Sequence, residues 1–137
     1  TFNSIQAAID AASPGDTITV AAGTYDEQVV VDEQLTLNGA NAGVNAVTGA
    51  RGSESIIDGG TSTAVTISAD DVIVDGFTLD GGVTLDDTAN LVSGGTISNN
   101  IITGADNPTD PPKAQNGIRV GFDSFYIGLG VDGVTIE

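Results

Sequence analysis

The chain has 137 residues, enough for one domain, and 19 acidic against three basic residues give it a net charge of −16. This charge disfavours nucleic acid and anionic membranes as partners, so we expect no nucleic-acid binding and no membrane insertion. The absence of Cys and His excludes disulfides, thiolate metal sites and every catalytic set that needs His. Met is also absent, so we expect a processed chain or a fragment of a longer protein, with any signal peptide outside this sequence.

The first predicted element is a helix over residues 3–13, with Asn3 or Ser4 as its N-cap. Its apolar residues recur at the spacing of one helical face, at Ile5, Ala8, Ile9 and Ala12. A helix this short needs a surface to cover. We expect it to cap the end of a stack of strands, because terminal repeats of a stacked fold need a cap.

Short strands are predicted next, at residues 17–20, 29–31 and 35–37. Residues 21–25 are predicted as a turn, and residues 40–55 as a loop because they are rich in Ala, Asn and Gly. The stacked coils are expected to extend over residues 17–103.

An internal repeat lies at residues 65–100. Val65-Thr66-Ile67 returns as Val83-Thr84-Leu85, and residues 74–79 return at the same interval as residues 92–97. A third copy of the second half follows at residues 131–136. A short fixed period indicates stacked units that cannot bury their apolar faces alone. The predicted fold is therefore all-β, a parallel β-helix in which Ile67 and Leu85 stack in the core.

Two registers are open after residue 90. In the shorter one, each coil has the length of the repeat, so that Val74 aligns with Val92. In the longer one, residues 95–97 form the second strand of their coil and residues 99–103 the third, which gives a coil in the low twenties of residues.

Several segments in this order resemble the N-terminal part of the pectin-lyase-like superfamily of right-handed parallel β-helices; they are residues 5–12, 14–18, 23–25, 35–43 and 51–59. The resemblance implies the right-handed form, whereas the apolar spacing alone would also suit a left-handed one. The superfamily includes lyases, esterases and hydrolases as well as surface proteins, so the resemblance does not select one activity.

The C-terminal part is predicted to contain a Pro-rich loop at residues 104–116 and a last partial coil at residues 117–137. In lyases of the superfamily an Arg or Lys abstracts a proton beside calcium held by Asp. The resemblance makes Arg119 a weak catalytic candidate, together with Asp106, Asp110 and Asp123. No set matches residue by residue, and a solvent-facing partner for one of these aspartates is the favoured role of Arg119.

Four aspartates, Asp70, Asp71, Asp86 and Asp87, lie at equivalent or neighbouring corners. Stacked carboxylates repel one another, and a hard cation such as calcium would relieve the repulsion. The favoured alternative is that Asp suits turns and faces solvent, so no cofactor is required.

Two further patterns involve pairs of residues. Arg51 and Glu54, three positions apart, are expected to form an ion pair within the loop. Two outward threonine ladders are expected, Thr66 with Thr84 and Thr78 with Thr96. Because each face offers one Thr per coil, ice binding is only a remote alternative.

The first functional hypothesis is a non-catalytic extracellular module, structural or adhesive, in a surface or secreted protein. Its expected partners are a polysaccharide, a neighbouring protein module or a second copy bound end to end. The alternative is the N-terminal part of an enzyme that acts on acidic polysaccharide.

Overall fold

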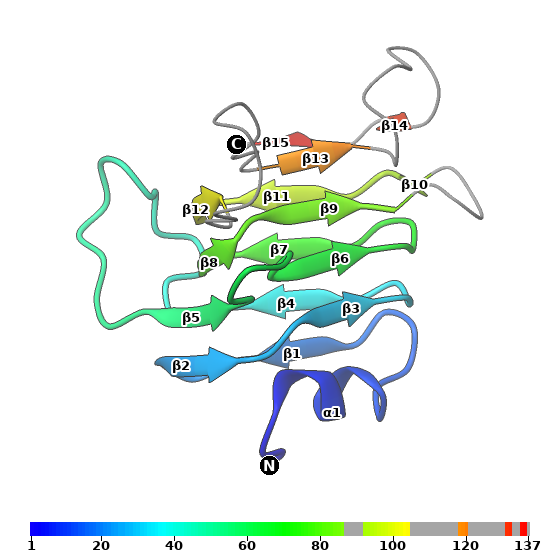
Figure 1. The fold of residues 1–137 in the computed structure, drawn as a ribbon, viewed down its shortest axis with the longest axis horizontal. Helices are drawn as coiled ribbons and strands as arrows, with labels where there is room; N and C mark the ends of the chain where they lie inside the picture. The colour runs from blue at the N-terminus through cyan, green and yellow to red at the C-terminus, as the bar shows by residue number, and fades with distance from the viewer. Residues whose placement is uncertain (87–91, 105–117, 121–130, 133–134, 137) are drawn as a thin grey trace.

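The computed structural model describes residues 1–86, 92–104, 118–120, 131–132 and 135–136, and for the residues from 104 onward only the backbone is described. Apart from the short helix α1 (Ile5–Ile9), the regular elements of this part are strands, and all their pairings are parallel (Figure 1). The expected all-β parallel fold is thus confirmed. Within the described residues no helix has the length and apolarity needed to cross a membrane.

The strands form three large parallel sheets and one small one. The first sheet has the order β1 (Thr17–Thr19), β4 (Thr36–Asn38), β7 (Ile73–Asp75), β11 (Thr96–Ser98) and β15 (Thr135–Ile136). The second has the order β12 (Ile101–Gly104), β8 (Thr78–Gly81), β5 (Ser55–Asp58) and β2 (Gly23–Asp26). The third has the order β13 (Ile118–Val120), β9 (Val83–Leu85), β6 (Val65–Ile67) and β3 (Val29–Val31). The small sheet pairs β10 (Val92–Ser93) with β14 (Val131–Asp132).

Successive strands of the chain belong to different sheets. The chain enters the first sheet at β1, the second at β2 and the third at β3, and then returns to the first at β4. The same rotation repeats through β9. Each strand therefore pairs with strands far from it in the sequence, and the chain climbs by one strand spacing per round.

The strand pairing expected from the repeat at residues 65–100 is confirmed in its first half, and in its second half the structure selects one of the two open registers. Val65 pairs with Val83 and Ile67 with Leu85, at the interval of the repeat. Val74, however, pairs with Ile97 rather than with Val92. The longer of the two predicted registers is therefore correct at this point.

The change of register has a simple cause in chain length. Residues 68–72 connect β6 to β7, whereas the longer segment 86–95 connects β9 to β11. The additional residues of the second connection account for the longer register, and β10 lies among them. The third copy of the motif is confirmed, because Val131 pairs with Val92 and Ile136 with Ile97.

Two local predictions near the N-terminus are wrong. Residues 21–25 do not form a simple turn, because Gly23–Asp26 is strand β2, in register with β5. The helix is shorter than residues 3–13 and ends at Ile9, although Ser4 is its N-cap as predicted, its Oγ accepting a hydrogen bond from the Ala7 N–H at 3.1 Å. At residues 23–26, pairing with a distant strand overrides the local preference for a turn.

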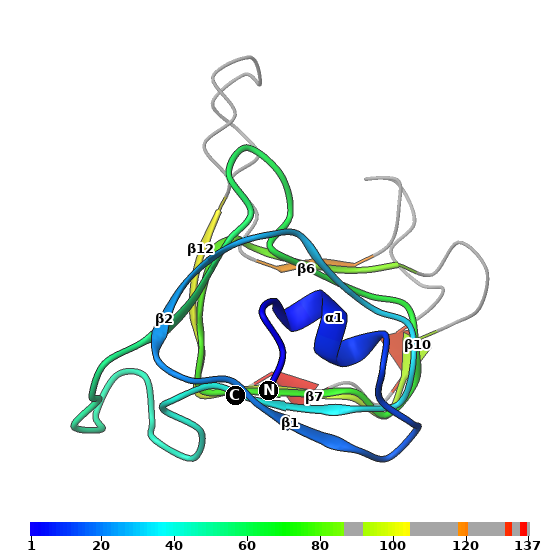
Figure 2. The ribbon, with the colours of Figure 1, turned by 90° about the horizontal axis from the view of Figure 1, so that it is seen from below.

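The core lies between the three sheets. The inward apolar residues of β3 to β11 are almost fully buried, including Leu37, Ile57, Ile67, Leu79 and Leu85. As predicted, Ile67 and Leu85 are both core residues. Figure 2, seen from below, shows the strands around a common interior with α1 lying across its end. Ile5 and Ile9 of α1 belong to the same apolar cluster, so the helix covers this end of the core.

Candidate functional site

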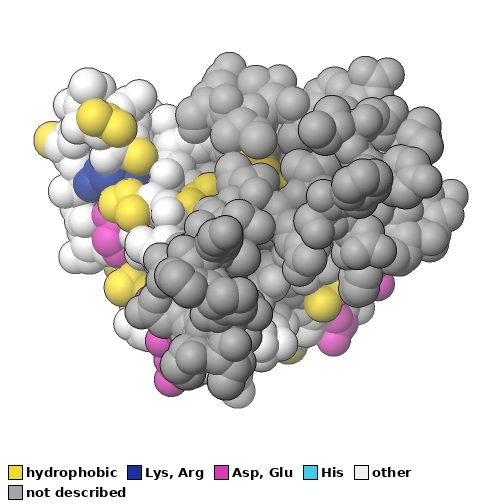
Figure 3. All heavy atoms as spheres, turned by 45° about the horizontal axis from the view of Figure 1, so that its top comes forward, with side chains coloured by type: hydrophobic (Ala, Val, Ile, Leu, Met, Phe, Trp, Pro, Cys, Tyr) yellow, Lys and Arg dark blue, Asp and Glu magenta, His cyan; other side chains and the backbone are white. Residues whose placement is uncertain are grey.

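The loop between β4 and β5 contains the predicted ion pair. Arg51 donates from Nε to Glu54 Oε1 and from Nη2 to Glu54 Oε2, both at 2.8 Å. The pair is confirmed and bidentate, a geometry that Lys cannot reproduce. Figure 3 shows the dark-blue basic side chain beside magenta acidic ones, with apolar side chains around them.

Arg51 also binds three backbone carbonyls. Nη1 donates to the carbonyls of Val44 at 3.1 Å and Asn99 at 2.6 Å, and Nη2 donates to that of Phe77 at 3.3 Å. Phe77 follows β7, and Asn99 follows β11. Arg51 therefore fastens the loop to the corners of two successive rounds of the chain, a role that the sequence reasoning missed.

We call Arg51, Glu54 and their hydrogen-bond partners the Arg51 junction. Its hydrogen bonds favour the charged forms of both Arg51 and Glu54. The hydrogen bond from Arg51 holds the pKa of Glu54 below its ordinary value, although partial burial opposes this shift. Thr78 Oγ1 supports the same carboxylate at 3.2 Å. The hydrogen bond with Glu54 in turn raises the pKa of Arg51, so both partners stay ionised at neutral pH.

The donors of Arg51 are fully used. A guanidinium has about five N–H groups, and the contacts with Glu54, Val44, Asn99 and Phe77 occupy all of them. Its side chain is only 9% exposed. No donor is left for a substrate or ligand, so Arg51 holds the fold together.

Neighbouring polar side chains also form hydrogen bonds that stabilise the corners. Asn100 accepts from the Phe77 N–H and donates to the Val74 carbonyl, both at 2.8 Å. Asp75 accepts from the Asn99 side chain at 2.7 Å and from the Gly43 N–H at 2.9 Å. These contacts satisfy corner groups that the sheet ladders leave unpaired.

The described calcium candidates lie on successive connections from the third sheet to the first, Asp70 and Asp71 between β6 and β7 and Asp86 directly after β9. Asp70 Oδ1 accepts from the Ser93 N–H at 2.8 Å and from the Ser93 hydroxyl at 3.1 Å. Asp71 donates its N–H to the Ser93 carbonyl at 2.8 Å. Asp86 donates its N–H to the Ile67 carbonyl at 2.7 Å. Asp70 and Asp71 are thus stacked against Ser93 rather than against Asp86.

No calcium cluster is assembled in the part of the chain that the structure describes. That part holds no group of three or more acidic side chains placed to bind a metal ion. Asp87 lies outside the described residues. Calcium binding by the four predicted aspartates therefore remains a prediction.

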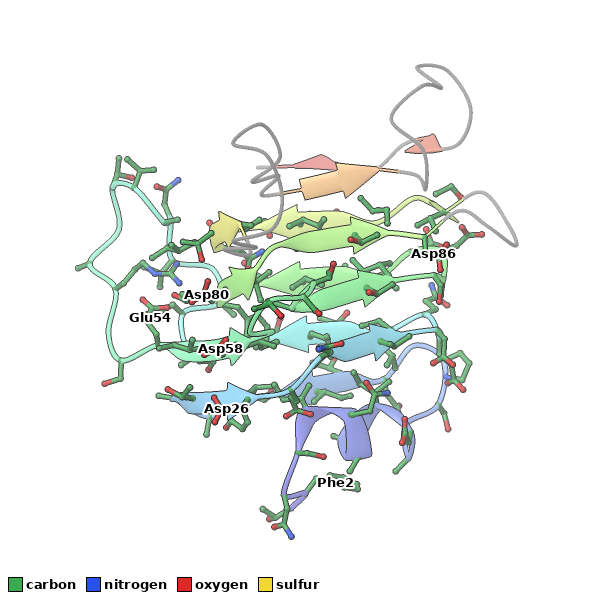
Figure 4. The ribbon with its side chains drawn as sticks, viewed as in Figure 1. Phe2, Asp26, Glu54, Asp58, Asp80 and Asp86 are labelled. Carbon is green, nitrogen blue, oxygen red and sulfur yellow. The ribbon has the colours of Figure 1, made fainter. Side chains whose placement is uncertain are left out.

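A different group of acidic residues is aligned across three neighbouring strands of the second sheet. Asp26 pairs in register with Asp58, and Asp58 pairs with Asp80. Figure 4 shows these three labelled residues on β2, β5 and β8, one above the other. We call them the aspartate column. Neighbouring parallel strands are about 4.8 Å apart, so three carboxylates follow one another at short intervals.

The aspartate column was missed because Asp26, Asp58 and Asp80 are not spaced at the interval of the repeat. A signal was present in the sequence, since Asp58-Gly59 and Asp80-Gly81 each close a strand. Hydrogen bonds stabilise two of these carboxylates: Asp58 accepts from the Gly60 N–H and Asp80 accepts from the Thr103 hydroxyl, both at 2.8 Å. Asp26 and Asp58 also line a surface groove of about 470 Å³.

The C-terminal candidates can be located only in part. Arg119 is on β13, in register with Thr84 of β9. Its side chain lies outside the description, as do Asp106, Asp110 and Asp123. The catalytic candidate set therefore stays a prediction.

One of the two predicted threonine ladders is confirmed. Thr66 pairs in register with Thr84. Thr78, by contrast, pairs with Ile101 in the second sheet, while Thr96 pairs with Ile73 in the first. The second ladder was wrong because it assumed the shorter register beyond residue 90.

Comparison with known proteins finds a relative at the cell surface. The chain is 35% identical over 108 residues to a cell surface glycoprotein of Methanothermus fervidus. The aligned part is 77% of this chain but only 16% of that protein, so the chain spans a small share of its relative. No known protein family matches the chain. No solved structure matches it either.

Proposed function

We propose that the chain is a structural, non-catalytic module of a protein exposed at the cell surface or secreted. The observation that carries the proposal is the 35% identity to a cell surface glycoprotein along 77% of this chain. The net charge of −16 supports it, because such a surface remains soluble without a partner and repels nucleic acid.

The fold that we propose for this module is a right-handed parallel β-helix of the pectin-lyase-like type. The support is the rotation of the chain through three parallel sheets, together with a core of aligned apolar residues. Parallel strands in one sheet are joined by right-handed crossovers in about 98% of cases, which favours the right-handed form. An experimental structure in which the chain winds to the left would refute this part of the proposal.

The structural role is supported by how the polar side chains at the corners are used. Arg51, Asn100 and Asp75 direct their hydrogen bonds to the backbone and side chains of their own chain. Catalytic groups need donors or acceptors that a substrate can reach. These residues instead stabilise the corners on which a stacked fold depends.

The surface location can be tested by proteolytic shaving of intact cells that produce the chain. We expect its peptides to be released before lysis, together with those of known surface proteins and without a cytoplasmic marker. Recovery of the peptides only after lysis would refute the location.

The non-catalytic role can be tested with acidic polysaccharides. We expect no cleavage of pectate or alginate, with or without calcium, when the unsaturated product of a lyase is followed by its ultraviolet absorbance. Turnover that is lost in Arg119→Ala would favour the enzyme alternative. Binding of the polymer without turnover would identify a polysaccharide partner for the module.

A further inference from the structure

The third sheet has one of its edges at β3, and a side chain of α1 pairs with this edge. Gln6 Oε1 accepts from the Val30 N–H at 2.8 Å, and Gln6 Nε2 donates to the Val30 carbonyl at 3.2 Å. A side-chain amide offers a donor and an acceptor, as a peptide group does. Gln6 therefore supplies Val30 with the two hydrogen-bond partners that a further strand would supply.

The neighbouring residue of β3 bonds to the opposite side. The Val29 N–H donates to the carbonyl of Ala64, directly before β6, at 2.9 Å. The Val30 N–H donates instead to Gln6 of α1. Two successive amides of one strand thus have different partners, one in the next round of the chain and one in the helix that covers the end of the core.

Glu27 holds α1 in this position. Its Oε1 accepts from the Ile5 N–H at 2.9 Å, and its Oε2 accepts from the Gln6 N–H at 3.1 Å. The first N–H groups of a helix have no partner within the helix, so these two bonds satisfy groups that would otherwise be unpaired. Glu27 lies between β2 and β3, and its carboxylate therefore fastens the start of α1 to the segment that leads into β3.

α1 has little stability of its own. It contains five residues, whereas an isolated helix is marginal in water below about 12–15 residues. Ile5 and Ile9 are buried at 3% and 2% exposure, while Ala7 and Asp10 are exposed. Segments with few buried contacts open locally while the rest of a protein stays folded. The position of α1 therefore depends on two buried side chains and on the bonds of Gln6 and Glu27.

We propose that α1 is an end cap that opens and closes as one unit while the strands stay folded, with Gln6 in place of a strand and Glu27 holding the cap closed. The closed cap blocks the β3 edge, because the N–H and the carbonyl of Val30 are both engaged. The open cap frees both groups for another strand. Glu27 has no described hydrogen bond to Val30, so it acts on this edge through α1.

Amide hydrogen exchange of the whole chain, followed residue by residue by NMR, tests the proposal. Under conditions in which the exchange rate reports the free energy of opening, we expect similar protection of the Ala7 and Val30 N–H groups and much stronger protection of Val29. Glu27→Gln retains one acceptor oxygen and removes the charge. It should accelerate exchange at Ala7 and Val30 by a common factor of at least about ten and leave Val29 unchanged, although neither Ala7 nor Val30 has a described bond to Glu27.

Gln6→Ala is the second variant. It should accelerate exchange at Val30 more than at Ala7, because Val30 then has no partner even when the cap is closed. Asp32→Asn is the matched control, since it removes an exposed carboxylate directly after β3 and should change none of these rates.

Three results would overturn the proposal. The first is equal protection of Val29 and Val30 in the wild-type chain. The second is a Glu27→Gln variant in which Val29 is accelerated together with Val30, because α1 would then open only with the strands. The third is a Glu27→Gln variant that leaves Val30 unchanged, or that accelerates it no more than Asp32→Asn does.

Discussion

The Arg51 junction and the aspartate column both contain carboxylates, but only the carboxylate of the junction is paired with a described basic side chain. Glu54 is 22% exposed and receives two hydrogen bonds from one guanidinium. Asp26, Asp58 and Asp80 are aligned with one another and have no described basic partner. The difference shows that Arg51, one of three basic residues in the chain, is used where a corner is closed, whereas the aspartate column has no described basic partner.

The largest expected effect comes from placing a carboxylate in a third environment, the core. Ile67 is 2% exposed, and Ile67→Asp would bury a charge without a partner, so we expect a loss of several kcal/mol of unfolding free energy. That is comparable with the total stability of a domain, about 5–15 kcal/mol. Urea denaturation measures the loss. Thr66→Asp, on the neighbouring outward position, should lose less than about 1 kcal/mol, and equal losses would contradict the inward assignment of Ile67.

Removing the cation of the junction should have the next largest effect. Arg51→Met leaves Glu54 and three carbonyls without their donor, and we expect it to lower the unfolding free energy by about 3 kcal/mol. Arg51→Lys should recover only part of the loss, because Lys cannot make the bidentate contact. A double-mutant cycle with Glu54→Gln separates the ion pair from the carbonyl contacts. A coupling energy near zero would show that the carbonyl contacts, and not the pair, stabilise the loop.

The same junction should make stability depend on pH. The pKa of Glu54 is lower in the folded protein than its ordinary value of 4.5, because Arg51 donates to the carboxylate. The unfolded chain therefore binds more protons near and below pH 4.5, and the stabilisation is complete above this range and lost as pH falls through the folded pKa. Unfolding free energies measured from about pH 6 downward should fall less steeply for Glu54→Gln. Asp32→Asn, which removes one exposed carboxylate, is the control for charge alone; a wild-type slope in Glu54→Gln would contradict the prediction.

The aspartate column should respond in the opposite direction to the junction. Asp58→Asn keeps the oxygen that accepts from Gly60 but removes the central charge of three, so we expect a gain of about 0.5 kcal/mol at low salt. The gain should shrink as salt is added, because screening weakens the repulsion that the variant relieves. Thermal unfolding at two ionic strengths measures both effects. A loss of stability at low salt would mean that the Asp58 charge is stabilised by its surroundings.

Calcium should have the smallest effect. Because Asp70 at the predicted corner is already hydrogen-bonded to Ser93, we expect millimolar calcium and sodium chloride of equal ionic strength to raise the melting temperature equally. The shift of the melting temperature is the measurement. A larger shift with calcium would identify a specific site, and Asp87→Asn would then test whether the predicted corner contributes to it.

The sequence by itself determined the inward and outward faces of the strands and the local pairs. Alternation with a period of two placed Ile67 and Leu85 inside and Thr66 and Thr84 outside, because successive side chains of a strand point to opposite faces. The close spacing of Arg51 and Glu54 was enough to predict their pairing. These features depend on neighbours within the same strand or loop.

The tertiary structure alone decided the register between rounds of the chain. The pairing of Val74 with Ile97 depends on how much chain the corner between β9 and β11 takes up, and the in-register alignment of Asp26 with Asp58 depends on where β2 meets β5. The binding of Arg51 to the carbonyls that follow β7 and β11 results from the same alignment. Corner length does not alter the alternation of apolar and polar residues within a strand, so this alternation does not predict the register. The register is instead selected by burial and hydrogen bonding summed over strands that are distant in the sequence.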